Sequence, residues 1–316
     1  MGEGGYKQIN KTLNVCAFED YLAKQQSVLP ALADVEQLSP RVIRILGQNP
    51  GKFTLQGTNT YVVGTGTKRL LIDTGQGFRE WIVLIRETLS QHDITLSHVL
   101  LTHWHGDHTG GVPDLIQMDP HLRNSVWKHS PEGFQRAIEE GDEIQVEGAT
   151  IHAIHTPGHS HDHMCFVLQE ENAMFTGDNI LGHGVSSAVE ELSTYMNTLH
   201  KMQAQNCGIG YPAHGALIPN LQIKISSELA RKIRRENQYL LALQQVKKDR
   251  MAASQTIGVT VEELVLVLHG MEIDAEIRRM ALEPFVEEVL RKLAEDSKAA
   301  FQVRGGVQRW FALDSL

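Results

Sequence analysis

Six consecutive positions, 103–108, read HWHGDH and hold three histidines and one aspartate. Imidazole nitrogens and carboxylate oxygens form a donor set that suits Zn²⁺ first, with Mn²⁺ and Fe as alternatives. His103 and His105 alternate along the chain, so both face the same side of an extended segment. Asp107 and His108 then belong to the turn that opens the next helix. One short segment can therefore offer ligands to two neighbouring metal ions.

Three further candidate ligands follow downstream, each at a point where a β-like run ends and a loop begins. They are His159 in TPGH, Asp178 in FTGDN and His214 in PAHG. Rigid sheets position functional side chains at such strand ends. A lone histidine such as His121 or His200 is usually a surface or core residue, whereas the ordered set of seven indicates a metal centre.

Other polar residues near these motifs leave alternatives open. Asp73 of LIDTG is expected to hydrogen-bond a ligand or its turn, although an aspartate that simply ends a strand fits equally well. His161 and His163 compete with His159 as ligands on composition alone, and only the TPGH turn favours His159. We expect His163 to support a ligand and His161 to be exposed. His183, between two glycines, either borders the site or is solvated.

Composition places the chain among ordinary globular proteins. It has 316 residues, of which 41% are hydrophobic and 21% charged, close to average usage. A formal charge of −9 argues against a general polyanion binder. The three cysteines, Cys16, Cys165 and Cys207, are too few and too scattered for a disulfide framework. Cys165 lies in the apolar run MCFVL, so we expect a buried thiol without chemistry.

The sequence gives no sign of a membrane segment. No apolar run approaches the roughly 18 residues of a membrane span, and the N-terminus lacks the pattern of a signal peptide. We therefore expect a cytoplasmic protein with no membrane partner. The oligomeric state cannot be inferred from the sequence.

The spacing of apolar and turn residues predicts three parts. Residues 1–38 form an N-terminal extension with short amphipathic helices over 16–35. Residues 39–222 alternate β-like runs with helices, which is typical of α/β layering. Residues 223–316 form a small helical module that ends in a β-ribbon, and a long basic amphipathic helix over 222–249 leads into it.

The motifs LIDTG, THWHGDHTGG, TPGH, FTGDN and PAHG, in this order, resemble the metallo-β-lactamase fold superfamily over residues 40–220. The resemblance implies an α/β fold, an αββα sandwich with the site at one edge of its two sheets. The C-terminal module would then be winged-helix-like. The implied ligands form two sets of three with a bridging carboxylate: His103, His105 and His159; Asp107, His108 and His214; and Asp178 between them.

A closer likeness extends over nearly the whole chain. Phrases such as LLTHWHGDHTGGV, HTPGHSHDHMCFVL and EENAMFTGDNILGHG are similar to the fungal atrochrysone carboxyl acyl-carrier-protein (ACP) thioesterases of non-reducing polyketide synthase clusters. This resemblance implies hydrolysis of a polyketide thioester held on the ACP, with release of a carboxylic acid in secondary metabolism. Asp107 would also donate and accept a proton. Release could be coupled to Claisen-type ring closure, and the sequence does not separate the two outcomes.

Two other activities would use the same metals. The chain is also similar to the animal lactamase-β-like endoribonucleases, and the basic stretch ARKIRR at 230–235 would suit RNA. A solvated helix face explains this stretch more simply, and no RNA-binding motif accompanies it. A glyoxalase-II-like hydrolase of small thioesters would need a glutathione site, for which no strong cluster is visible. A purely structural zinc site has four saturating ligands, whereas seven ligands for two metals leave room for water and favour an enzyme.

Overall fold

The computed structural model describes residues 29–184, 186, 189–270, 275 and 278–314. These residues divide into two compact units. The first contains residues 29–190 and Thr194–Ser226, and the second contains 191–193 and the described residues from Ser227 onward. The change of unit at 226/227 lies within a long helix. The predicted boundaries after 38 and 222 stay predictions.

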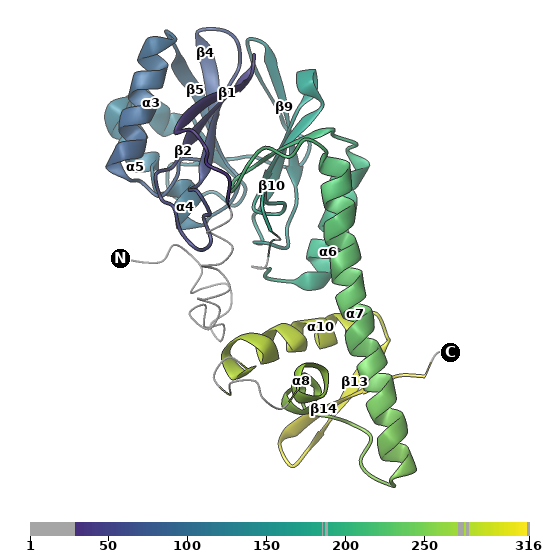
Figure 1. Ribbon diagram of the computed structural model, residues 1–316. Helices are drawn as coiled ribbons and strands as arrows, with labels where there is room; N and C mark the ends of the chain where they lie inside the picture. Colours follow the sequence, from purple (N-terminus) through teal and green to yellow (C-terminus); the bar gives the residue numbers. More distant parts are fainter. Residues whose placement is uncertain (1–28, 185, 187–188, 271–274, 276–277, 315–316) are drawn as a thin grey trace. The chain divides into compact units, whose positions relative to one another are not determined.

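The first unit is built on two β-sheets (Figure 1). The seven-stranded sheet has its strands in chain order: β1 (Val35–Ser39), β2 (Val42–Leu46), β3 (Asn59–Val63), β4 (Lys68–Ile72), β5 (Thr95–Leu101), β6 (Val126–Lys128) and β7 (Arg136–Ala137). Its strands β1 to β4 are antiparallel, and β4 to β7 are parallel.

The second sheet has five strands in the order β12-β11-β10-β9-β8. They are β8 (Glu143–Val146), β9 (Ala149–His155), β10 (Met164–Leu168), β11 (Ala173–Gly177) and β12 (Ile209–Pro212). Strands β8 to β11 are antiparallel, and β12 pairs parallel to β11. The parallel pairing places the ends of β11 and β12 at the same edge of the sheet, so the loops that follow them are neighbours.

Apolar side chains on both faces of the first sheet explain the layers. One face packs on the second sheet, as Val42, Tyr61 and Leu70 join a buried cluster with Phe166 and Phe175. The opposite face packs on helices α3 (Arg79–Gln91) and α5 (Val112–Met118), where the buried residues are Ile43, Ile45, Val62, Leu71, Trp81, Ile85, Leu89, Val112 and Leu115, among others. A strand covered on both faces carries apolar residues toward both. In β2, Val42 joins the cluster with the second sheet, and Ile43 and Ile45 join the cluster with the helices.

Helix α6 (Leu192–Ala204) covers the outer side of the second sheet, and its Lys201 Nζ donates to the carbonyl oxygen of His155 at the end of β9 at 2.8 Å. Its residues Leu199 and Met202 are fully buried. The order of layers is therefore helix, sheet, sheet, helix, and the predicted αββα fold is confirmed. Short helical turns complete the unit: α4 (Gly106–Thr109), η2 (Pro120–Asn124) and η3 (Gln169–Glu171).

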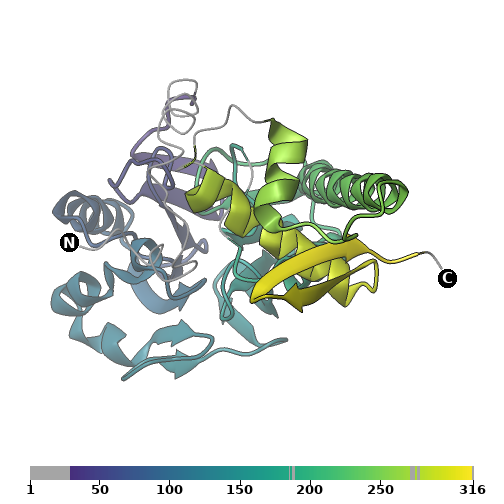
Figure 2. The same ribbon diagram turned by 90° about the horizontal axis from the view of Figure 1, so that it is seen from below.

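The C-terminal unit combines helices with a β-ribbon (Figure 2). Its elements are the part of α7 (Leu221–Ala252) from Ser227 on, α8 (Val261–His269), the π-turn η4 (Arg278–Leu282), α10 (Glu283–Glu295), and the antiparallel pair β13 (Ala299–Arg304) and β14 (Val307–Ala312). A capping box between Thr260 and Glu263 fixes the start of α8. The predicted long helix and terminal ribbon are thus present.

One expectation from the sequence is wrong. Residues 29–34 form no helix, and Val35–Ser39 is a strand paired with β2, so the helix predicted over 16–35 is wrong in its described part. The rest of that helix lies outside the described residues. The helix expected after Asp107 and His108 is present as α4 and α5, whereas the two-residue strand β7 was not predicted. Among the described residues, no helix is both long and apolar enough to cross a membrane.

Gly111 marks a close approach between the first sheet and α5. A Cβ at this position would lie 2.2 Å from the Thr74 carbonyl oxygen and 2.3 Å from the Trp81 ring. We expect Gly111→Ala to lower the free energy of unfolding by about 1–3 kcal/mol, because overpacking forces the neighbours to shift. Urea denaturation measures this. Gly208→Ala, which adds a methyl group in open space, is the matched control, and equal stability of the two variants would refute the steric argument.

Candidate metal centre

The candidate ligands lie on loops that follow strands of both sheets. His103 and His105 follow β5, and the short helix α4 carries Asp107 and His108. The remaining three come from the second sheet: His159 from the loop between β9 and β10, Asp178 from the end of β11, and His214 from the end of β12. All seven are buried. The structure therefore brings together every ligand that the sequence predicted.

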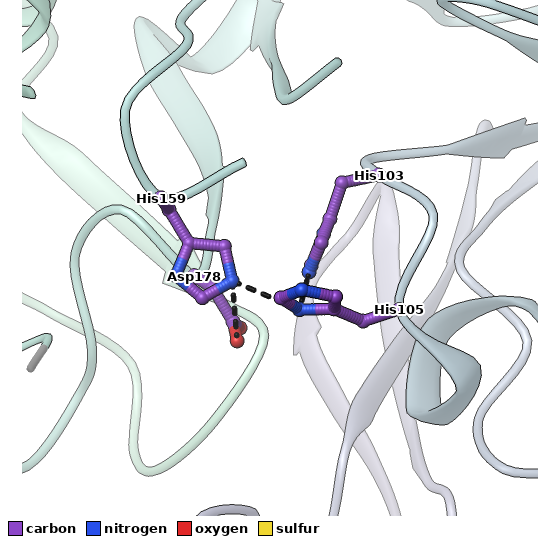
Figure 3. Close-up of side chains that lie close together, drawn as sticks. All are labelled: His103, His105, His159 and Asp178. Carbon is purple, nitrogen blue, oxygen red and sulfur yellow. Dashed lines mark hydrogen bonds and ion pairs between the residues drawn. The ribbon is translucent and has the colours of Figure 1, made fainter. Parts of the chain in front are cut away.

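The first group contains His103, His105, His159 and Asp178, whose side chains point toward one another in Figure 3. Their potential ligand atoms all lie within 4.8 Å of one another. His105 Nδ1 is 2.8 Å from His103 Nε2 and 3.0 Å from His159 Nε2. Three imidazoles and one carboxylate at these distances surround a space suited to a single cation.

The second group contains Asp107, His108 and His214. Asp107 Oδ2 lies 3.2 Å from His214 Nε2 and 3.3 Å from His108 Nε2. Asp178 reaches both groups with different oxygens. Its Oδ1 is 3.2 Å from His214 Nε2, and its Oδ2 is 3.5 Å from His159 Nε2. Asp178 therefore has the geometry of a bridging carboxylate.

The donor atoms of the second group fit a bound cation. Both carboxylate oxygens of Asp107, Asp178 Oδ1, His108 Nε2 and His214 Nε2 are buried and make no hydrogen bond within the described part of the chain. Burying a carboxylate without hydrogen bonds is costly unless a charge compensates it. These converging atoms, together with the histidine-rich first group, are what a metal site requires.

Burial controls the protonation of the first group. It lowers the pKa of His103 well below its ordinary value and that of His105 to about 3, and the neighbouring imidazoles add to this effect. Both rings are therefore neutral and have lone pairs to offer. Burial also opposes charge on His108 and His214, but the nearby Asp107 and Asp178 outweigh it. They raise the pKa of His108 and bring that of His214 to about 9.

Asp73 hydrogen-bonds a predicted ligand, which is one of the two roles expected for it. Its Oδ2 accepts a hydrogen bond from His108 Nδ1 at 2.8 Å, which directs His108 Nε2 toward Asp107 and Asp178. Its Oδ1 accepts from the backbone N–H of Thr102 at 2.8 Å. Such partners fix the tautomer and direction of a ligating histidine.

The structure separates the three histidines of the TPGHSHDH motif. The backbone N–H of Asp178 donates to His163 Nε2 at 3.1 Å, so His163 supports the bridging aspartate and its Nε2 is already used. His161 is 67% exposed and lies 3.6 Å from Glu190. His159 alone of the three joins the first group. The roles expected for His163 and His161 are confirmed.

Two weaker expectations can also be compared with the structure. Burial raises the pKa of the Cys165 thiol to about 12, and Thr156 Oγ1 donates to its sulfur at 3.3 Å, so Cys165 is an inert core residue as expected. His183 is half-buried, and its backbone borders the turn at Gly215 that follows His214. Its side chain belongs to neither of the two ligand groups.

Sequence reasoning missed two residues that support ligands. Thr102 Oγ1 lies 2.8 Å from Asp73 Oδ2 and 2.9 Å from His103 Nδ1, which links the aspartate to the first group. Asn59 Nδ2 donates to the carbonyl oxygens of Pro212 and Gly215, both at 2.8 Å, and so holds the loop of His214. The position of Thr102 next to His103 was an available signal, whereas nothing in the sequence marks Asn59.

Curated relatives cover almost the whole chain. The atrochrysone carboxyl ACP thioesterase of Aspergillus aculeatus is 68% identical over 99% of this chain and 100% of its own length. That of Paecilomyces divaricatus is 64% identical over 100% of this chain and 99% of its own length. A third, from Emericella nidulans, is 60% identical over 99% and 98%. The likeness therefore includes the C-terminal unit as well as the metal centre.

Solved structures show the same fold at low identity. A beta-lactamase domain protein from Burkholderia ambifaria has a TM-score of 0.69 at 16% identity and covers 90% of this chain and 95% of its own. A metallo-beta-lactamase family protein from Thermus thermophilus has a TM-score of 0.62 at 18% identity and covers 88% and 100%. The profile of the metallo-beta-lactamase superfamily matches residues 53–214. The chain, with its αββα sandwich, therefore belongs to the metallo-beta-lactamase superfamily.

Proposed function

We propose that the protein is a metal-dependent thioesterase that hydrolyses a polyketide thioester on the acyl carrier protein of a non-reducing polyketide synthase. The observation that carries this proposal is the combination of two ligand groups sharing Asp178 with 68% identity to an ACP thioesterase over nearly the full chain. The product is a carboxylic acid similar to atrochrysone carboxylic acid.

The donor set supports a pair of Zn²⁺ ions, with Mn²⁺ or Fe as alternatives. His103, His105 and His159 would hold one ion, and Asp107, His108 and His214 the other, with Asp178 between them. When bound, the metals supply Lewis acidity, which polarises the thioester carbonyl and makes water reactive at neutral pH.

The side chains of the protein contribute the remaining steps. Asp107 accepts a proton from the attacking water and returns it to the leaving sulfur, because its buried oxygens make no competing hydrogen bond within the described residues. Burial opposes ionisation of Asp107, but His108 and His214 hold its pKa well below the ordinary range, so Asp107 is a carboxylate at neutral pH. Asp73 and Thr102 keep the ligating rings in orientation.

Release of product from the carrier protein tests the proposal. Purified protein is incubated with the polyketide-loaded carrier protein, and the products are identified by mass spectrometry, with and without a chelator. We expect a free carboxylic acid whose formation stops with the chelator and resumes when Zn²⁺ is added. Undiminished release in the presence of the chelator would contradict the metal mechanism.

The same experiment separates the competing activities. A ring-closed product would indicate Claisen-type release, which the same residues support. Two parallel substrates, a small glutathione thioester and a single-stranded RNA, test the glyoxalase-II-like and endoribonuclease alternatives. The names of the close relatives favour neither. Faster turnover of either substrate than of the carrier-bound thioester would overturn the proposal.

A further inference from the structure

A buried ion pair lies beside the metal centre, outside the seven ligands. Lys128 ends β6 of the first sheet, and Asp162 belongs to the loop of the second sheet that carries His159. Lys128 Nζ lies 2.5 Å from Asp162 Oδ2, and the two side chains are only 5% and 0% exposed. The pair therefore ties the loop of His159 to the other sheet, from which His103 and His105 come.

Both charged groups also contact neighbours besides each other. Besides its ion pair with Asp162, Lys128 Nζ donates hydrogen bonds to the carbonyl oxygens of His129 at 3.1 Å and Ser130 at 3.0 Å. Asp162 Oδ1 accepts a hydrogen bond from Ser160 Oγ at 2.8 Å. Since Ser160 directly follows His159, the chain of contacts from β6 ends one residue from the ligand.

A buried ion pair of this kind fixes the relative positions of two segments more than it raises the free energy of unfolding. Desolvation of two buried charges offsets most of their attraction, so an apolar pair of the same volume is often equally stable. A buried pair whose two members also hydrogen-bond their own segments, as Lys128 and Asp162 do, fixes the direction in which those segments meet. Other contacts of the loop come from its own sheet, from α6 and from Glu190. They run from His155 Nε2 to His161 O, from Thr198 Oγ1 to Pro157 O and from the Glu190 backbone N–H to Gly158 O.

We propose that Lys128 and Asp162 are positioning residues that hold His159 in register with His103 and His105, so that the three rings meet on one metal. This inference rests on the proposed function, because it takes His159 as a ligand. Lys128 and Asp162 lie outside the set of seven predicted ligands.

The double variant Lys128→Met/Asp162→Leu tests this role without leaving a lone buried charge. We expect it to fold, and we expect one of two bound Zn²⁺ ions to bind about 10–100-fold more weakly, as for other residues that orient metal ligands. The second ion should bind as in the unaltered protein. Titration of the metal-free protein with Zn²⁺ against a chromophoric chelator measures both affinities, and circular dichroism reports the fold.

A matched control uses another buried pair, in the C-terminal unit. Lys292 Nζ lies 3.0 Å from Glu236 Oε2, and their side chains are 10% and 6% exposed. The variant Lys292→Met/Glu236→Leu removes the same charges, and Lys298, which also contacts Glu236, is 44% exposed and stays solvated. We expect unaltered binding of both ions. Equal weakening in this control would show a general effect of lost ion pairs and would overturn the positioning role.

The remaining outcomes separate this inference from the proposed function. An unaltered protein that binds no Zn²⁺ would contradict the metal centre itself. Two ions bound with unchanged affinities in the double variant would overturn only the role of Lys128 and Asp162, as would equal weakening of both ions. If the double variant does not fold, Asp162→Asn keeps the shape and the Ser160 contact, and the same selective loss is expected.

Discussion

The variant Asp107→Asn is expected to lower kcat for thioester hydrolysis by about 10²–10⁴-fold, the usual contribution of a positioned acid–base group. Asparagine has the size of aspartate and keeps an oxygen near His108 and His214, which lie 3.3 and 3.2 Å from Asp107 Oδ2. An amide, however, cannot accept the proton of the attacking water. KM should change little, because Asp107 acts on the reacting atoms. Steady-state kinetics with the carrier-bound thioester measure both constants.

Metal content distinguishes the two roles assigned to Asp107. If asparagine retains two ions while kcat falls, the lost function is proton transfer. If the variant loses an ion and excess metal restores the full rate, Asp107 acts only as a ligand and the proton-transfer role is wrong. Asp249→Asn is a suitable control, since Asp249 is exposed on α7 and its carboxylate accepts a hydrogen bond from Gln245 Nε2. Its kinetics should match those of the unaltered protein.

The pH dependence of the reaction follows from the same contacts. Burial would raise the pKa of the Asp107 carboxyl, but His108 and His214 lower it well below the ordinary range. A group with a lowered pKa stays ionised until the pH falls below its usual value. The rate should therefore show no loss from protonation of Asp107 as the pH is brought from neutral toward the ordinary pKa of an aspartate, about 3.9.

The regular elements of the first unit could be predicted because each has a local signal. Strands such as VIRIL and KRLLI are apolar or β-branched and end at Gly or Thr-Gly, and α3 repeats apolar residues at helical spacing. Strand β1 has no such signal. Its sequence VEQLS is mostly exposed, and it forms a strand because the chain reverses after Ser39 and pairs with β2. Tertiary contact decided its structure.

In the candidate metal centre, too, some residues could be predicted from the sequence and others could not. Each ligand lies next to a turn motif, so its identity could be inferred from a few neighbouring residues. The supporting contacts have no such mark, because they form only when distant segments meet. Asn59 and Pro212 are 153 positions apart, and Lys128 and Asp162 come from different sheets. From the sequence alone, a buried lysine at the end of a strand cannot be distinguished from an exposed lysine.

The bridging position of Asp178 predicts a different effect from that of any histidine ligand. Because Asp178 Oδ1 lies near His214 and Oδ2 near His159, Asp178→Asn should weaken the binding of both ions, whereas His159→Ala should weaken only one. The loss of kcat/KM in Asp178→Asn should reach about 10³-fold, since the Lewis acidity of the metals is worth several kcal/mol and each ~1.4 kcal/mol is a factor of ten.

Metal titration with two resolved affinities, together with elemental analysis of the purified variants, separates these cases. His161→Ala is the matched control for His159→Ala, because His161 lies in the same loop and is 67% exposed. It should bind both ions unchanged. An Asp178→Asn variant that loses one ion and binds the other at full affinity would place Asp178 in a single group, and the two metals would then be independent. Weaker binding of both ions would indicate a carboxylate shared by the two ligand groups. Within the described residues, no side chain of these groups other than Asp178 has one oxygen near each group.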